Sequence, residues 1–156
     1  MAKIDFDPKN YNFFCEVCDT HVLKNTKHCQ RCNRCSYEFD HHCVWVSNDI
    51  GLHNYIDFMR MLTAVFFTVI SHFTLCVYTL ATLNKISNEA YVGYTTRKSL
   101  ESLNWVTIAI LVILAILDTY LLIFHVYLIC INTSTYKHMR RKQKRGKSRI
   151  IVELEN

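Results

Sequence analysis

The sequence predicts an α-helical membrane protein, in which an antiparallel pair of transmembrane helices follows a small domain rich in loops and β-hairpins. Two observations predict this fold. Charged residues are almost absent from two long apolar runs, and six of the 8 cysteines lie in the polar segment before them. The 156 residues are 51% hydrophobic but include only 3 Gly and 1 Pro, and the apolar residues are bunched, which argues against an ordinary soluble domain.

The first segment, residues 1–14, reads MAKIDFDPKNYNFF. It contains acidic residues and a proline and lacks an apolar core, so it is not a signal peptide. We therefore expect the first apolar run to act as the signal for membrane insertion.

The second segment, residues 15–58, carries cysteines at the spacing of a metal site. Cys15-x2-Cys18 and the overlapping run Cys29-x2-Cys32-x2-Cys35 are joined by interleaved histidines. A C-x2-C turn brings two thiolates onto one Zn²⁺, whereas disulfides are disfavoured in the reducing cytosol. The segment has little apolar surface, so bound metal would supply much of its folding free energy. We identify no internal repeat beyond the cysteine spacing itself.

Counting ligands leaves two assignments open. Two tetrahedral sites need about eight donors. Six cysteines and two histidines would fill both sites and leave no thiol. Five cysteines and two histidines would need one more donor, for which Asp49 is the nearest oxygen ligand, and Cys43 would then stay free.

The run Asp40-His41-His42-Cys43 favours the second assignment. A thiol becomes a nucleophile when nearby cations, imidazole or metal lower its pKa. An imidazole can take the thiol proton, and a carboxylate can fix the tautomer of that imidazole.

Two apolar runs follow, and each is long enough to span a bilayer. They give transmembrane helices at 59–83 and 105–131, a lumenal or extracellular loop at 84–104 and a basic tail at 132–156. Eight Lys and Arg residues without an acidic residue lie between 137 and 149. Because positive charge is retained in the cytosol, we expect the tail, and with two spans also the cysteine-rich domain, to be cytosolic.

Several polar residues and thiols lie within these spans. His72 and Asp118 are predicted at similar depth, so they either pair with each other or Asp118 faces other helices. Cys76 and Cys130 are expected to be inert buried thiols, with acylation of Cys130 near the cytosolic surface as the alternative. His125 is expected to help couple its span to the cysteine-rich domain.

The cysteine-rich segment resembles the Asp-His-His-Cys (DHHC) protein S-acyltransferases, or palmitoyltransferases. The resemblance rests on Cys15-x2-Cys18-x9-His28-Cys29-x2-Cys32-x2-Cys35-x4-Asp40-His41-His42-Cys43 and continues through Trp45, Asn48, Gly51, Asn54 and Phe58. The ending FHVYLICINTST also resembles the end of the family's last span. The family resemblance covers residues 11–137. It also implies two further spans before the cysteine-rich domain, whereas this sequence has only 14 residues before Cys15.

The resemblance implies two structural zinc ions and a site for each. One would be held by Cys15, Cys18, His28 and Cys35, and the other by Cys29, Cys32, His42 and Asp49. Cys43 would be the nucleophile, His41 its base and Asp40 the residue that orients His41. Palmitoyl-CoA or another fatty acyl-CoA would acylate Cys43, and its phosphates would meet basic residues near the surface, with contacts from Thr135, Arg140 and Arg141.

The acyl group would then pass to cytosolic cysteines of membrane-associated proteins. The expected partners are these substrates, acyl-CoA and the bilayer, in the ER, Golgi or plasma membrane, with no nucleic acid. Departures from the family pattern include Asp49, where cysteine is usual, Val44 for proline and Lys137 for glutamate. The alternatives are a catalytically silent zinc-binding membrane adaptor and a zinc hydrolase with water at the Asp49 site.

Overall fold

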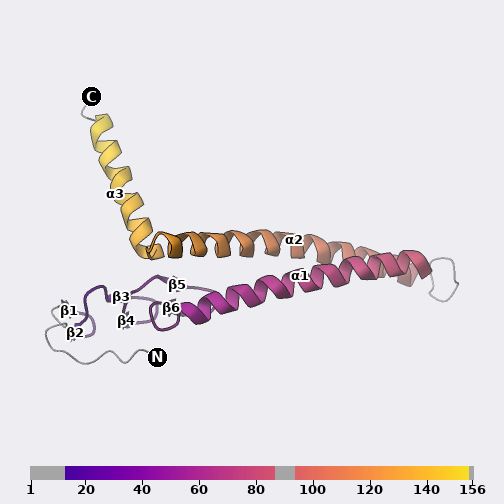
Figure 1. Cartoon of the computed structure of the whole chain (residues 1–156), viewed down its shortest axis with the longest axis horizontal. Coiled ribbons are helices and arrows are strands. Elements are labelled where there is room, and N and C mark those ends of the chain that lie inside the picture. The colour runs from indigo at the N-terminus through magenta and orange to yellow at the C-terminus, as the bar shows by residue number, and fades with distance from the viewer. Residues whose placement is uncertain (1–12, 87–93, 155–156) are drawn as a thin grey trace. The chain divides into compact units, whose positions relative to one another are not determined.

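The computed structural model describes residues 13–86 and 94–154, which form six short strands and then three helices (Figure 1). The strands are β1 Phe13–Cys15, β2 Thr20–Val22, β3 Lys27–Cys29, β4 Arg34–Ser36, β5 His41–Cys43 and β6 Asn48–Ile50. The helices are α1 Tyr55–Ile86, α2 Tyr94–Cys130 and α3 Thr135–Leu154. The chain divides into two compact units, Met1–Phe58 with His125–Asn156, and Met59–Phe124.

The strands pair into three antiparallel hairpins, β1–β2, β3–β4 and β5–β6. The hairpins read FFCEVCDTHV, KHCQRCNRCS and HHCVWVSNDI, and they start at residues 13, 27 and 41, so the interval is 14 residues each time. The cysteine spacing, the one repeat found in the sequence, therefore marks a structural repeat of whole hairpins. Side-chain identity hides the repeat, because only the cysteine at the end of each first strand is common to all three hairpins.

Each hairpin turn ends in a residue with a left-handed backbone. These residues are Asp19, Asn33 and Ser47, with φ of 48°, 48° and 47°. Asp and Asn adopt this conformation more readily than other residues with a side chain, because their short polar groups bond the local backbone. The shared turn lets each return strand pair in the same register with the strand before it.

The third hairpin leads directly into α1 through Gly51 and Asn54. The Gly51 N–H donates to Asn54 Oδ1 over 2.9 Å, Asn54 Nδ2 donates to the Asp49 carbonyl over 2.8 Å, and the Asn54 carbonyl accepts the Phe58 N–H. A Cβ on Gly51 would lie 2.9 Å from the Tyr37 carbonyl oxygen, so only glycine fits here without a shift. Asn54 is thus the N-cap of α1.

The second unit holds the apolar lengths of α1 and α2. Tyr55–Leu83 and Thr96–Cys130 are long and apolar enough to cross a membrane. The helices touch through Val69, Cys76 and Leu111, and Asn104 Nδ2 donates to the Cys76 carbonyl over 2.9 Å. Helix α2 already begins at Tyr94, so much of the loop predicted at 84–104 is helical, while 87–93 lies outside the described residues.

The structure bears on the two alternatives for His72 and Asp118 and on the two thiols of these helices. Among the described residues no ion pair joins His72 to Asp118: His72 is exposed, and Asp118 Oδ2 is buried without a hydrogen-bond partner. Cys76 is buried as expected, but Cys130 is exposed. Cys130 is exposed because α2 turns much of its surface outward in this chain, with 6% of its most apolar stretch buried.

A tight turn separates α2 from α3. Asn132 has φ of 47°, the Thr133 N–H donates to the Leu128 carbonyl and the Asn132 N–H donates to the Ile129 carbonyl, each over 3.0 Å. This pattern is a Schellman cap, which satisfies the last carbonyls of a helix. Ser134 Oγ accepts the Lys137 N–H over 3.3 Å, so Ser134 is the N-cap of α3. The tail predicted at 132–156 is therefore largely helical, because α3 covers Thr135–Leu154.

Candidate functional site

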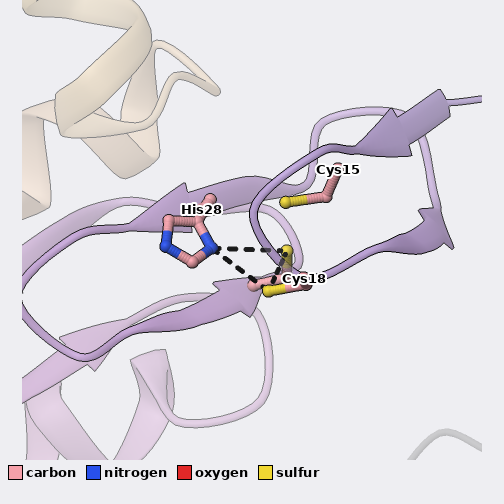
Figure 2. A group of neighbouring side chains, drawn as sticks. Cys15, Cys18 and His28 are labelled. Atoms are coloured by element: carbon pink, nitrogen blue, oxygen red, sulfur yellow. Dashed lines mark hydrogen bonds between the residues drawn. The ribbon is translucent and has the colours of Figure 1, made fainter.

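The first group of metal ligands joins the first two hairpins. Cys15, Cys18, His28 and Cys35 offer ligand atoms that all lie within 4.8 Å of one another. His28 Nδ1 lies 3.2 Å from Cys18 Sγ and 4.0 Å from Cys35 Sγ, and the sulfurs of Cys18 and Cys35 are 3.6 Å apart. Figure 2 shows Cys15, Cys18 and His28 converging on one point from different segments.

The second group joins the second and third hairpins in the same way. Cys29, Cys32, His42 and Asp49 also lie within 4.8 Å of one another. His42 Nδ1 is 3.8 Å from Cys29 Sγ, 3.3 Å from Cys32 Sγ and 2.9 Å from Asp49 Oδ1. Both groups have the membership that the family resemblance implied.

The hairpin repeat explains why neighbouring residues serve different groups. Side chains alternate between the two faces of a strand. His28 and Cys29 therefore point to opposite faces and enter different groups. Directly opposed residues share a face, and the opposed pairs His28–Cys35 and His42–Asp49 each supply two donors to one group. Each group thus takes two cysteines from one hairpin and a cross-strand pair from the next.

The donor geometry fits a tetrahedral metal ion. Ligands at ordinary zinc bond lengths lie about 3.4 to 3.8 Å from one another, close to the separations in both groups. Asp49 is 2% exposed, and its Oδ2 atom is buried without a hydrogen-bond partner. The nearest cationic group to this oxygen is Arg34 Nε at 3.9 Å, too far for a hydrogen bond. A buried carboxylate oxygen without a hydrogen bond, among two thiols and an imidazole, is the donor that a metal cation would satisfy. The two groups could hold metal ions, and their sulfur and nitrogen donors suit zinc.

Cys35 in the first group and Cys32 in the second keep their thiol protons until a metal ion binds. Burial raises the pKa of the Cys35 thiol to about 12, reinforced by its hydrogen bonds to Cys15 and Cys18. Desolvation and the neighbouring Asp49 carboxylate raise the pKa of Cys32 to about 11. Burial opposes ionisation of Asp49 too, but hydrogen bonds to Cys29 and His42 outweigh it and lower its pKa. A metal ion must therefore displace thiol protons to bind, since the thiolate is the ligand.

Cys43 belongs to neither group. It ends β5, at the position held by Cys15 and Cys29 in the earlier hairpins, and it is buried. The second cysteine of the repeat, at Cys18 and Cys32, is replaced by Val46 in the third hairpin. Cys43 thus has no partner thiol in its own turn, and β6 is followed by helix α1 instead of another hairpin that would supply a cross-strand pair.

Hydrogen bonds hold the Asp40–His41 pair, which lies just before Cys43 in the sequence. His41 Nδ1 lies 2.7 Å from Asp40 Oδ2, and His41 shares a strand face with Cys43 because the two residues are two positions apart in β5. Asp40 is 3% exposed. Its Oδ1 accepts the Thr135 N–H over 2.7 Å, and its carbonyl accepts the Tyr136 N–H over 3.1 Å.

The first turn of α3 therefore stabilises the Asp40 carboxylate. Backbone N–H groups at a helix N-terminus carry partial positive charge and favour an anion. Burial would raise the pKa of Asp40, but the hydrogen bonds from His41 and Thr135 outweigh it and hold that pKa below its usual range. An ionised Asp40 accepts the proton of His41 Nδ1, which leaves Nε2 as the basic nitrogen.

A basic pocket of about 560 Å³ opens between α3 and the segments on either side of the second hairpin. Its cationic lining residues are Lys24, Lys27, Lys137, Arg140, Arg141 and Lys144. Lys27 also lies 3.9 Å from the centre of the Tyr136 ring, and Lys137 Nζ is 3.0 Å from Glu38 Oε2. Of the residues predicted to contact acyl-CoA, Arg140 and Arg141 line this pocket, whereas the Thr135 N–H is engaged by Asp40.

Sequence reasoning expected His125 to couple its span to the cysteine-rich domain, but it did not predict two contacts of this site. Tyr55 and His125, which are 70 residues apart, are hydrogen-bonded over 3.1 Å next to the Asp40–His41 pair. Glu38 supplies the partner of Lys137, the residue that departs from the family pattern. No local sequence signal pairs residues so far apart, although the spacing of the three hairpins was readable.

The structure has two groups of candidate metal ligands, each formed by two hairpins, and one cysteine outside both groups. It also has two helices long enough to cross a bilayer. These features define a class of membrane-associated metal-binding protein with a candidate reactive thiol. The comparison with known families makes this specific. The chain belongs to the DHHC palmitoyltransferase family, whose profile matches residues 9–142. The family resemblance read from the cysteine motif is thereby confirmed.

Individual relatives agree with the family. The chain is 38% identical to Protein S-acyltransferase 10 of Arabidopsis thaliana over 139 residues, which is 85% of this chain and 36% of the relative. It is 33% identical to Protein S-acyltransferase 8 of the same plant over 139 residues, 86% of this chain and 32% of the relative. It is 38% identical to Palmitoyltransferase ZDHHC4 of Bos taurus over 88 residues, 54% of this chain and 25% of the relative. The chain thus spans a quarter to about a third of the length of these relatives.

Proposed function

We propose that this chain carries the transferase centre of a protein S-acyltransferase, which moves a fatty acyl group such as palmitoyl from acyl-CoA to cysteines of membrane-associated proteins. The observation that supports it most is the separation of Cys43 from both candidate metal groups, together with the hydrogen-bonded Asp40–His41 pair just before it in the sequence. Structural zinc would fix the three hairpins and leave one thiol for chemistry.

The first step transfers the acyl group to Cys43. His41 Nε2 takes the Cys43 proton, and the thiolate attacks the thioester carbonyl carbon of acyl-CoA. The carbon–sulfur bond to CoA breaks, and the departing CoA thiolate receives a proton from His41. Asp40, held ionised by the first turn of α3, keeps His41 in the tautomer that this exchange needs.

The second step restores the free thiol. His41 takes the proton of a substrate cysteine, whose thiolate attacks the acyl thioester carbon on Cys43. The bond from that carbon to the Cys43 sulfur breaks, and the Cys43 thiolate receives the proton from His41. This order of events is a two-step ping-pong reaction. It suits a thiol close to a bilayer, because the acyl chain is apolar and the substrate cysteine is in water.

The basic pocket is the proposed binding site for the CoA phosphates. Six Lys and Arg side chains line it, and paired guanidinium groups bind phosphate oxygens well. Arg140 and Arg141 are the residues that we expect to contribute most. The positive charge of α3 also agrees with a cytosolic location for both the hairpins and the tail.

Labelled palmitoyl-CoA tests the proposal directly. The purified chain in detergent should form a hydroxylamine-labile adduct that is lost on Cys43→Ser and retained on Cys130→Ser, the exposed thiol control. An adduct that survives Cys43→Ser, or none at all from zinc-loaded protein, would favour the silent zinc-binding adaptor instead.

A further inference from the structure

His125 is a buried polar residue for which the proposed reaction gives no role. It is 1% exposed and lies in the last turns of α2. Its neighbour Leu128 is fully buried, so an apolar side chain would also suit the interior at this level. A buried imidazole costs free energy unless it is hydrogen-bonded, which a packing role alone does not explain.

His125 joins the Asp40–His41 pair on one side. A ring nitrogen of His125, a ring nitrogen of His41 and a carboxylate oxygen of Asp40 all lie within 4.8 Å of one another. The ring centres of His125 and His41 are 5.6 Å apart. Phe58 packs edge-on against both, with ring centres 5.0 Å from His125 and 5.2 Å from His41.

On its other side His125 is bound to Tyr55. The Tyr55 hydroxyl lies 3.1 Å from His125 Nδ1. When the hydroxyl donates to Nδ1, the ring proton of a neutral imidazole must reside on Nε2. A neutral ring with its proton on Nε2 presents a donor to a neighbouring carboxylate, and it adds no positive charge beside the His41 base.

We propose that His125, fixed as the Nε2–H tautomer by Tyr55, is a positioning residue that orients the Asp40–His41 pair toward Cys43. The inference rests on the proposed function, since His41 is taken as the base for the Cys43 thiol. It extends the acid–base centre from the third hairpin to α1 and α2, through Tyr55 and His125. Phe58 packs against both imidazole rings and thereby limits their movement.

The test measures the reactivity of Cys43 without acyl-CoA. Full-length chain in detergent is treated with iodoacetamide at one neutral pH, in a Cys130→Ser background, and alkylation of Cys43 is followed by peptide mass spectrometry. The variants are Tyr55→Phe, which removes only a hydroxyl, His125→Phe, which removes both nitrogens, and His125→Gln, whose amide can replace the Nε2 donor. Tyr120→Phe, on an exposed part of α2, is the matched control, and His41→Ala gives the rate without the base.

We expect His125→Phe to slow alkylation about 10-fold, toward the His41→Ala rate. Tyr55→Phe should slow it a few-fold, Tyr120→Phe should leave it unchanged and His125→Gln should recover part of the loss. Because Tyr55 acts through His125, the double variant should be no slower than His125→Phe. Acylation by palmitoyl-CoA should fall by the same factor at unchanged KM.

Three results would overturn the proposal. The first is a wild-type alkylation rate in both His125→Phe and Tyr55→Phe. The second is a fall in zinc content that parallels the fall in rate, which would make the role structural. The third is an additional metal ion lost on His125→Phe, which would make His125 a ligand. If wild-type protein forms no acyl adduct while the alkylation rates still differ as expected, the proposed function fails and the positioning role stands.

Discussion

The Thr135 N–H donates a hydrogen bond to Asp40 Oδ1 over 2.7 Å, across a sequence separation of 95 residues. This contact ties the first turn of α3 to the residue that holds His41, so the segment after the second apolar helix contributes to the candidate reactive centre. Together with the hydrogen bond from the Tyr136 N–H to the Asp40 carbonyl, it fixes Asp40 from both its side chain and its backbone.

Replacing Asp40 by Asn should lower the rate of acyl-adduct formation about 100-fold or more, because the neutral amide neither holds the His41 tautomer nor balances a protonated ring. Labelled palmitoyl-CoA measures the rate. Asp19→Asn is the matched control, since Asp19 is an exposed turn residue whose left-handed backbone Asn also adopts. An equal loss in both variants would mean that the effect comes from charge in general.

Replacing Asp49 by Ala should reduce bound zinc from about two ions per chain to about one, because a tetrahedral site loses one of its donors. Asp49→Cys should keep both ions and should slow their removal by a chelator, since thiolate is the better zinc donor. Metal content by plasma mass spectrometry gives the result, with Glu16→Ala in an exposed turn as the control. Two retained ions in Asp49→Ala would show that Asp49 is not a ligand.

Replacing Val46 by Cys should restore the two-cysteine turn in the third hairpin and thereby capture Cys43. A pair of cysteines at this spacing chelates soft metals, so added zinc should inhibit adduct formation at least 10-fold, and a mild chelator should reverse the inhibition. Val44→Cys adds a thiol to the same turn at the wrong spacing and is the control. Equal sensitivity to zinc in both variants would argue against the hairpin repeat as the reason that Cys43 is free.

Reversing one charge of the Lys137–Glu38 pair should weaken the docking of α3. Both side chains are partly exposed, so we expect Lys137→Glu to cost about 0.5 to 1 kcal/mol, and Glu38→Lys combined with Lys137→Glu to restore most of it. Thermal unfolding of the three variants gives the coupling. Additive losses in the double variant would indicate that the pair contributes no stability.

Replacing Gly51 by Ala should destabilise the third hairpin by about 1 to 3 kcal/mol, because the new Cβ would lie 2.9 Å from the Tyr37 carbonyl oxygen. Gly146→Ala is the matched control, since a Cβ there meets nothing within 4 Å and the position is in helix α3. We expect that variant to be as stable as the parent or more so. Denaturant unfolding compares the two, and equal stabilities would contradict the steric account of Gly51.

The family pattern also has a local structural explanation at several positions. Asn54 caps α1, Gly51 fits beneath the Tyr37 carbonyl, and Phe58 packs against the His41 ring. By contrast Trp45, in the turn that follows Cys43, is 88% exposed, and no contact among the described residues explains it.

The sequence by itself determined the kind of ligands, the family and the two apolar helices, because spacing and hydropathy are local properties that folding does not change. It left open whether Cys43 binds metal, since counting donors allowed two solutions. The family resemblance implied how the donors are grouped, and the tertiary structure supplies the physical reason, which is strand alternation within three repeated hairpins. The tertiary structure alone brought Thr135, Tyr55 and His125 to the Asp40–His41 pair, because such contacts depend on where the helices return in space and not on any neighbouring residue.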